Sequence, residues 1–310
     1  MNDKVIWSAT PTPFLANGDL DSASVEKLVE HHVALGVAGL FLAGSCGEGP
    51  FMPNGQRSEL VRLVRRLAGA RLQVAVQVSD TSAARVVENI RQAEDAGADA
   101  VVVAPPWMSR FCNRDFARRY FGEAIEASSV PVGLYVLGQP PETGIDLALW
   151  CEFAVHPKVR LLKDSSNTEA NERAFAAIRR QRTDLLLLTG YEFDVVRSID
   201  AGYDGGLLGT GILVAGFIRR ALDALAAGDR AGAEAWQERA NAFMYDLFGK
   251  DIGLWLGGLK YALVRQGLFA TEWMHLGYSL SEADRARIDA ALAREAEFLR
   301  PARGWGREST

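Results

Sequence analysis

Lysine is scarce in this chain of 310 residues, and the scarcity narrows its function. Only six of the 34 basic residues are lysines, and 39 acidic residues leave a formal net charge of −5. Without a basic excess the chain offers no broad cationic surface, so neither nucleic acid nor an anionic membrane is an expected partner.

Cysteines are also few, and long apolar runs are missing. The three cysteines, Cys46, Cys112 and Cys151, are widely separated, and an odd number does not suit a disulfide framework, which indicates a reducing compartment. Residues 1–14 lack the regions of a signal peptide, and no apolar stretch reaches the roughly 18 residues of a membrane span. We therefore expect a cytoplasmic protein.

Short apolar runs alternate with helical patterns along most of the chain. This alternation indicates a parallel sheet, and eight repeats of roughly 25 to 30 residues indicate a (β/α)₈ barrel, the TIM barrel. An open doubly wound sheet fits less well, because no strand–helix turn carries G-x-G-x-x-G with a later acidic residue. The predicted strands are 6–9, 39–43, 74–78, 100–104, 131–136, 159–163, 185–189 and 206–210.

The composition changes after residue 227. Residues 229–248, 253–266 and 281–299 read as helices without strands between them. We therefore expect a barrel domain over 1–227 and a C-terminal helical extension over 228–310, packed on the barrel, with a frayed tail at 301–310.

One lysine lies at the carboxyl end of a predicted strand. Within the run VRLLKDSS, 159–166, the predicted strand ends at Lys163, and Asp164 follows directly in the loop. Active sites of such barrels lie at the carboxyl ends of the strands. There a desolvated amine can attack a ketone and form a Schiff base, an electron sink for C–C or C–O cleavage. From this stretch alone, a surface lysine beside Asp164 is an equal alternative.

Other strand ends supply partners for that lysine. Tyr135 ends the preceding strand and can pass protons beside Lys163, although a core aromatic is the alternative. The loop GSCGEG, 44–49, offers backbone N–H groups and the Ser45 hydroxyl to a carboxylate. For Glu48 in that loop, a structural role is favoured over acid–base work.

Metal and cysteine mechanisms are disfavoured, and no cofactor is expected. Cys46 has no histidine in any strand-end loop to serve as its base. The acidic residues at strand ends show no clustered spacing, so no metal site is predicted. The turn GLLGTG, 206–211, fits either a phosphate site or a tight turn into a helix.

These motifs resemble the dihydrodipicolinate synthase and N-acetylneuraminate lyase family of class I aldolases, along essentially the whole chain. The likeness rests on WSATPTPF (7–14), GSCGEG, Tyr135, LLKDSS around Lys163, and the turns at 190–192 and 206–211. It implies that Lys163 forms a Schiff base with a 2-keto acid such as pyruvate and that Tyr135 is the proton shuttle. It also implies a homotetramer built from tight dimers. The candidate substrate-binding residues are Thr10, Ser45, Cys46, Trp107, Glu192 and Leu208.

Departures from the family pattern bear on the substrate. The segment 135–144 is two residues longer than in the synthases and lacks their carboxylate-binding arginine, and Glu142, nearest its place, would repel a carboxylate. Pro106 and Trp107 replace the family's paired tyrosines, and Cys46, a weaker donor, replaces a threonine. The turn at Glu192 is similar to one of sialate lyases and would accept hydrogen bonds from polyol hydroxyls.

The sequence thus predicts a Schiff-base lyase acting on a sugar-derived 2-keto-3-deoxy acid. Retro-aldol cleavage to pyruvate and an aldehyde is favoured slightly over dehydration. The sequence does not separate the two reactions, because both begin with the same imine. 4-Hydroxy-tetrahydrodipicolinate synthase is disfavoured by the missing arginine and tyrosine. A non-catalytic binding protein on the same barrel and a metal-dependent barrel lyase are the remaining alternatives.

Overall fold

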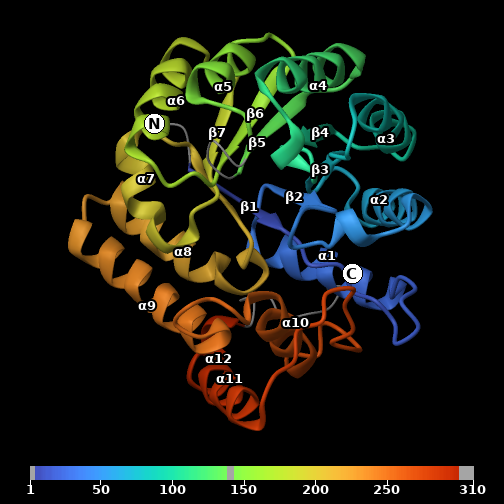
Figure 1. Ribbon diagram of the computed structural model, residues 1–310. Coiled ribbons are helices and arrows are strands. Elements are labelled where there is room, and N and C mark those ends of the chain that lie inside the picture. Colours follow the sequence, from blue (N-terminus) through green and yellow to red (C-terminus); the bar gives the residue numbers. More distant parts are fainter. Residues whose placement is uncertain (1–3, 138–142, 300–310) are drawn as a thin grey trace.

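Figure 1 shows the computed structural model, in which eight parallel strands form a closed barrel ringed by helices. The structure describes residues 4–137 and 143–299, so the expectations for Glu142 and the tail 301–310 lie outside the described residues. The predicted (β/α)₈ barrel is confirmed, and each predicted strand is found within a few residues of its expected place. The strands are β1 Val5–Ala9, β2 Gly39–Leu42, β3 Gln73–Gln77, β4 Ala100–Val103, β5 Val132–Val136, β6 Val159–Asp164, β7 Leu186–Thr189 and β8 Gly205–Leu208.

Helices cover the outside of the sheet, which explains why the strands read as continuous apolar runs. The predicted helix 192–201 differs: it opens with the 3₁₀ turn η3, Glu192–Asp194, because the Asp194 side chain caps the α-helix that follows by accepting from the Arg197 N–H. The helices are α1 Ser22–Leu35, α2 Asn54–Ala68, α3 Ala83–Asp95, α4 Arg114–Ala127, α5 Leu147–Ala154, α6 Glu169–Gln181, α7 Val195–Ala201 and α8 Gly211–Ala226, with 3₁₀ turns η1 Gly49–Phe51 and η2 Ser109–Phe111.

Up to residue 299, four further helices follow the barrel: α9 Arg230–Phe248, α10 Trp255–Arg265, α11 Glu282–Arg294 and α12 Ala296–Leu299. They lie together on one side of the barrel, with α9 along α8 (Figure 1). The predicted helix 281–299 is interrupted at Glu295, whose buried carboxylate binds Arg239 and Arg294. Phe243, Leu247 and other residues of these helices belong to the same hydrophobic cluster as the barrel.

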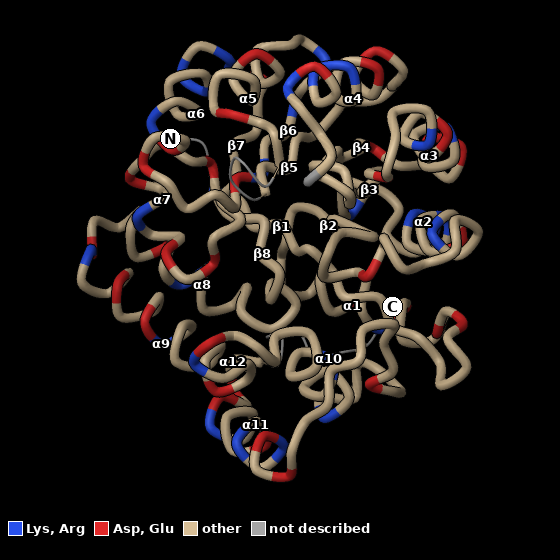
Figure 2. The backbone as a smooth tube through the Cα atoms, viewed as in Figure 1, with Lys and Arg blue, Asp and Glu red and all other residues tan. Residues whose placement is uncertain are grey.

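Charged residues gather on the outer helices, and the barrel strands carry few of them (Figure 2). This distribution follows from the cost of taking a charge out of water. Among the described residues, no helix combines the length and apolar character needed to cross a membrane.

Two adjacent histidines of α1 are buried against the barrel. His32 donates from Nδ1 to the Leu28 carbonyl at 2.7 Å and accepts the Ser8 hydroxyl at Nε2 at 2.9 Å. His31 donates from Nε2 to the carbonyl of Ile212 in α8 at 2.7 Å. Burial lowers the pKa of His31 from 6.5 to about 4 and that of His32 to about 3. Both imidazoles are therefore neutral in the folded protein at neutral pH.

We expect the fold to lose stability as the pH falls below 6.5. Between pH 6.5 and the folded pKa values, the unfolded chain binds more protons than the folded protein does. Each buried histidine therefore contributes its full stabilisation above pH 6.5, and in this range the free energy of unfolding falls by about 1.4 kcal/mol per pH unit for each of them. Urea unfolding at a series of pH values measures the slope. His32→Gln is expected to reduce this slope, and an equal slope in the variant and the unaltered protein would refute the origin in the buried histidines.

Candidate active site

Lys163 and Tyr135 lie side by side inside the barrel. They are paired in register on β6 and β5, and Lys163 Nζ lies 4.0 Å from the centroid of the Tyr135 ring and 5.3 Å from that of Phe41 on β2. Lys163 is 5% exposed and Tyr135 6%. An amine between aromatic faces in a nearly dry interior is positioned to react with a small ligand, because little water competes for it.

The residues around Lys163 exclude the alternative of a surface ion pair with Asp164. Successive residues of a strand point to opposite sides, and Asp164 accepts the Tyr203 hydroxyl at 2.6 Å and the Ser166 N–H at 2.9 Å. On the inner side, a Cβ at Gly190 would lie 2.0 Å from Ser165 Oγ and 2.8 Å from Lys163 Cε. A side chain at that position would therefore displace Ser165 or Lys163.

The loop after β2 carries Ser45 and Cys46 over the same end of the barrel. Thr12 donates to the Gly47 carbonyl at 2.7 Å, and the Cys46 thiol donates to the Gly209 carbonyl at 3.3 Å. Burial, reinforced by the Glu192 carboxylate, raises the pKa of the Cys46 thiol, so it stays neutral. Within the described part of the chain, the backbone N–H groups of Ser45 and Cys46 donate to no acceptor.

Glu48 has a structural role, as the sequence favoured, through a partner that the sequence did not reveal. Lys260 of α10 places its Nζ 2.5 Å from Glu48 Oε1, and both side chains are fully buried. The same amine donates to the Trp273 carbonyl at 2.8 Å, and the His275 N–H donates to Glu48 Oε2 at 2.6 Å. A lone lysine within the apolar run of α10 was a signal for a buried charge, but it did not indicate which residue is the partner.

Three other predicted substrate-binding residues, Glu192, Thr10 and Trp107, differ in their burial and in their hydrogen bonds. Glu192 Oε2 accepts the N–H and the hydroxyl of Thr210 at 2.9 and 2.5 Å, so this oxygen already holds the turn after β8. Desolvation raises the pKa of Glu192, and the hydrogen bonds from Thr210, followed by the Lys163 charge, oppose that shift. Thr10 is buried directly after β1, whereas Trp107 is 39% exposed after β4.

The strand register does not support the expected place of Leu208. Leu208 pairs with Ser8, whose hydroxyl bonds to His32 of α1, so both face the helices. Leu207 pairs instead with Trp7, which packs over Gly39 on the interior side. Leu207 is therefore the residue of β8 that faces the barrel interior.

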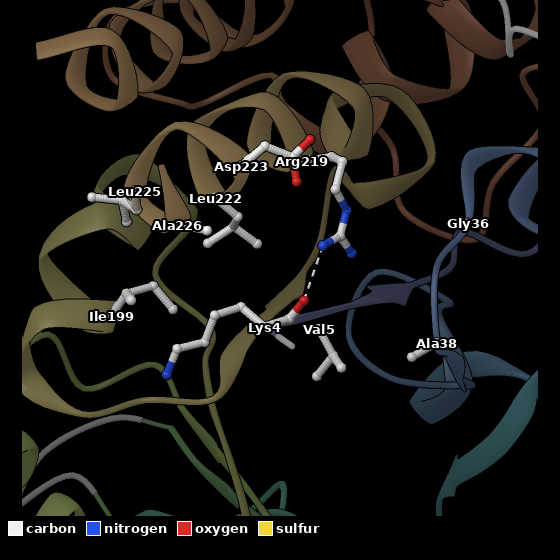
Figure 3. A pocket seen from close by; sticks show the side chains of 10 residues that line it. All are labelled: Lys4, Val5, Gly36, Ala38, Ile199, Arg219, Leu222, Asp223, Leu225 and Ala226. Carbon is white, nitrogen blue, oxygen red and sulfur yellow. Dashed lines mark hydrogen bonds between the residues drawn. The ribbon is translucent and has the colours of Figure 1, made fainter. Parts of the chain in front are cut away.

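A separate cavity of about 670 Å³ lies at the amino end of the barrel, away from Lys163. Figure 3 shows its apolar walls from α7 and α8, and the Arg219 guanidinium held by the Lys4 carbonyl at 3.0 Å. Active sites of these barrels lie at the opposite end, so the cavity is not part of this site. In the described residues no group of three or more His, Cys, Asp or Glu side chains could hold a metal ion.

The family match and the fold define the class of protein: a class I lyase, the kind of enzyme that works through a lysine Schiff base. The model of the dihydrodipicolinate synthetase family matches residues 2–294, and the chain belongs to that family.

Three relatives show the range of the similarity. The chain is 31% identical over 232 residues to 4-hydroxy-tetrahydrodipicolinate synthase 1 of Streptomyces coelicolor, covering 75% of this chain and 74% of the relative. It is 25% identical to YagE, a prophage protein of the family from E. coli K12 solved with pyruvate, with a TM-score of 0.83 over 95% and 99% of the two chains. N-acetylneuraminate lyase from Mycoplasma synoviae shares the fold, with 19% identity and a TM-score of 0.81 over 94% and 98%.

Proposed function

We propose that the protein cleaves a sugar-derived 2-keto-3-deoxy acid to pyruvate and an aldehyde through a Schiff base on Lys163. The observation that carries this proposal is the Lys163 amine held 4.0 Å from the Tyr135 ring inside the barrel. YagE, similar along nearly its whole length, was solved in complex with pyruvate. That complex supports a small 2-keto acid as the ligand of this chain.

The steps follow from the chemistry of the two side chains. The Lys163 amine adds to the C2 ketone, and loss of water gives an iminium ion. The C3–C4 bond then breaks as the C4 hydroxyl loses its proton, and the bonding electrons form an enamine with the iminium carbon. Tyr135 is the proton carrier for these transfers. Protonation of the enamine at C3 and hydrolysis release pyruvate and restore the amine.

The keto-acid carboxylate would bind at the loop after β2. The Ser45 hydroxyl and the backbone N–H groups of Ser45 and Cys46 can donate to it, and such oriented donors stabilise an anion well. The thiol of Cys46, bonded to the Gly209 carbonyl, contributes little. The backbone thus takes over the work of the hydroxyl that the family's threonine supplies.

Sugar-derived substrates fit better than the synthase substrate, although the curated relatives include synthases. The segment 136–144 contains no arginine to bind a second carboxylate, and an acidic residue stands near the expected position. Dehydration of a keto-deoxy sugar acid is the second candidate, because it uses the same imine.

Products distinguish the two reactions. We expect a panel of 2-keto-3-deoxy sugar acids to yield pyruvate and the matching aldehyde, followed by coupled oxidation of NADH with lactate dehydrogenase and by mass spectrometry. Loss of one water without pyruvate would support the dehydratase instead. Rapid formation of the synthase product from pyruvate and aspartate semialdehyde would contradict both sugar-acid readings.

We further propose a cytoplasmic homo-oligomer, a dimer of dimers. The three cysteines are free thiols, as in a reducing compartment. Trp107, Met108 and Phe111 expose 39%, 54% and 67% of their surface within five residues. Such an apolar patch is typical of a contact surface, and a monomeric mass in light scattering would contradict the assembly.

A further inference from the structure

Gln77, the last residue of β3, is a polar side chain in the barrel interior. It is 2% exposed. Ala75, two residues earlier on the same side of the strand, pairs with Phe41, and Gln77 itself pairs with Val102 on β4. Val102 packs against the position of Gly133, which precedes Tyr135 by two residues on the same side of β5. The Gln77 side chain therefore faces the same interior as Lys163 and Tyr135.

The amide of Gln77 is unsatisfied. Neither Oε1 nor Nε2 has a hydrogen-bond partner among the described residues. Buried side-chain amides are normally paired, because an unmet donor or acceptor loses its bonds to water without replacement. Gln56 on α2 is a useful contrast: its Oε1 is also unpaired, but its Nε2 donates to the Gly18 carbonyl at 3.0 Å.

The Gln77 amide lies near the same end of the barrel interior as Lys163 and Tyr135. Phe41, in register with Ala75, contacts the Tyr135 ring at 6.0 Å between centroids and lies beneath the Lys163 amine. Gln77 stands two residues nearer the carboxyl end of the barrel than Ala75. Because side chains of alternate strands share layers in these barrels, residues of β3 and β5 near this end face a common space.

We propose that Gln77 is a substrate-binding residue that recognises a hydroxyl group on the substrate chain beyond the imine carbon. An amide offers a donor and an acceptor at once, and a hydroxyl needs one of each. A carboxylate would leave Oε1 unmet, and an apolar chain would leave both atoms unmet. The inference rests on the proposed function and names the residue that recognises the hydroxylated chain of its substrate.

The test compares imine formation with two keto acids of equal chain length. Borohydride trapping at Lys163, followed by protein mass, gives half-saturating concentrations for 2-keto-3-deoxygluconate, 2-oxohexanoate and pyruvate. We expect Gln77→Met to reduce the preference for the hydroxylated acid over 2-oxohexanoate by about 10- to 100-fold, the loss expected for one buried hydrogen bond. Pyruvate trapping and the thermal midpoint are expected to be retained. Gln77→Leu replaces this variant if Gln77→Met does not fold.

The matched control Gln56→Met makes the same chemical change outside the barrel and is expected to leave the preference unchanged. An unaltered preference in Gln77→Met, or an equal loss for all three acids, would overturn the inference while leaving the Schiff-base proposal intact. Absence of pyruvate trapping in the unaltered protein would overturn both.

Discussion

Replacing Lys163 by alanine is expected to abolish lyase activity, with turnover lowered by about a thousand-fold or more. The reason is chemical: without the amine there is no imine and no electron sink for the breaking bond. The methyl group of alanine leaves the aromatic surroundings of Phe41 and Tyr135 in place, so the fold is expected to persist. Circular dichroism and the thermal midpoint check that point.

Borohydride trapping with pyruvate provides the direct measurement. The unaltered protein is expected to gain one reduced adduct that maps to Lys163, and Lys163→Ala to gain none. Lys27→Ala, which removes an exposed lysine of α1 that donates to the Gly267 carbonyl, is the matched control and should be trapped normally. Trapping in Lys163→Ala at another lysine would show that the reactive amine has been misassigned.

Breaking the buried pair of Glu48 and Lys260 is expected to destabilise the fold by about 3–5 kcal/mol. Both side chains are fully buried, so either partner left alone is an uncompensated charge. Burial lowers the pKa of Lys260, and the Glu48 carboxylate opposes that shift. Urea unfolding of Glu48→Gln and Lys260→Met measures the loss.

The double variant sharpens this result. Removing both charges leaves no lone ion, so Glu48→Gln with Lys260→Met is expected to be markedly less destabilised than the sum of the single changes. Glu123→Gln, which breaks a pair with Arg119 whose side chains are 50% and 68% exposed, is the control and should change stability by less than about 0.5 kcal/mol. Additive losses in the double variant would contradict a coupled pair.

This pair also has a consequence for the site. Glu48 belongs to the loop that carries Ser45 and Cys46, and its partners Lys260 and His275 come from the C-terminal part of the chain. The helices after the barrel therefore help to hold the loop that would bind the substrate carboxylate. Single variants that remain folded should bind pyruvate more weakly, as half-saturation of trapping would report.

Local patterns were sufficient for much of this architecture. Strand spacing and apolar runs predicted all eight strands, because a parallel barrel buries both faces of each strand. The same order placed Tyr135 and Lys163 on neighbouring strands, and the register confirms that they are paired. Helix boundaries were less accurate at Glu192, where the Asp194 side chain caps the helix that follows, and at Glu295, whose carboxylate binds Arg239 of α9.

Other features depend on contacts between distant segments. Leu208 was expected to face the substrate, but the pairing of β8 with β1 turns it toward the helices. Lys260 of α10 finds its buried partner, Glu48, in the loop after β2. Gln77 has no motif around it, and its significance appears only when its environment offers no partner.

The sequence by itself determined the barrel and the lysine at the end of its sixth strand, since periodicity and turn residues act over a few positions. Only the tertiary structure decided which side chains surround that lysine, which ion pair holds the loop after β2, and which amide remains unpaired. Those outcomes depend on strand register and on packing between segments more than 200 residues apart, as for Glu48 and Lys260, and no local pattern encodes them.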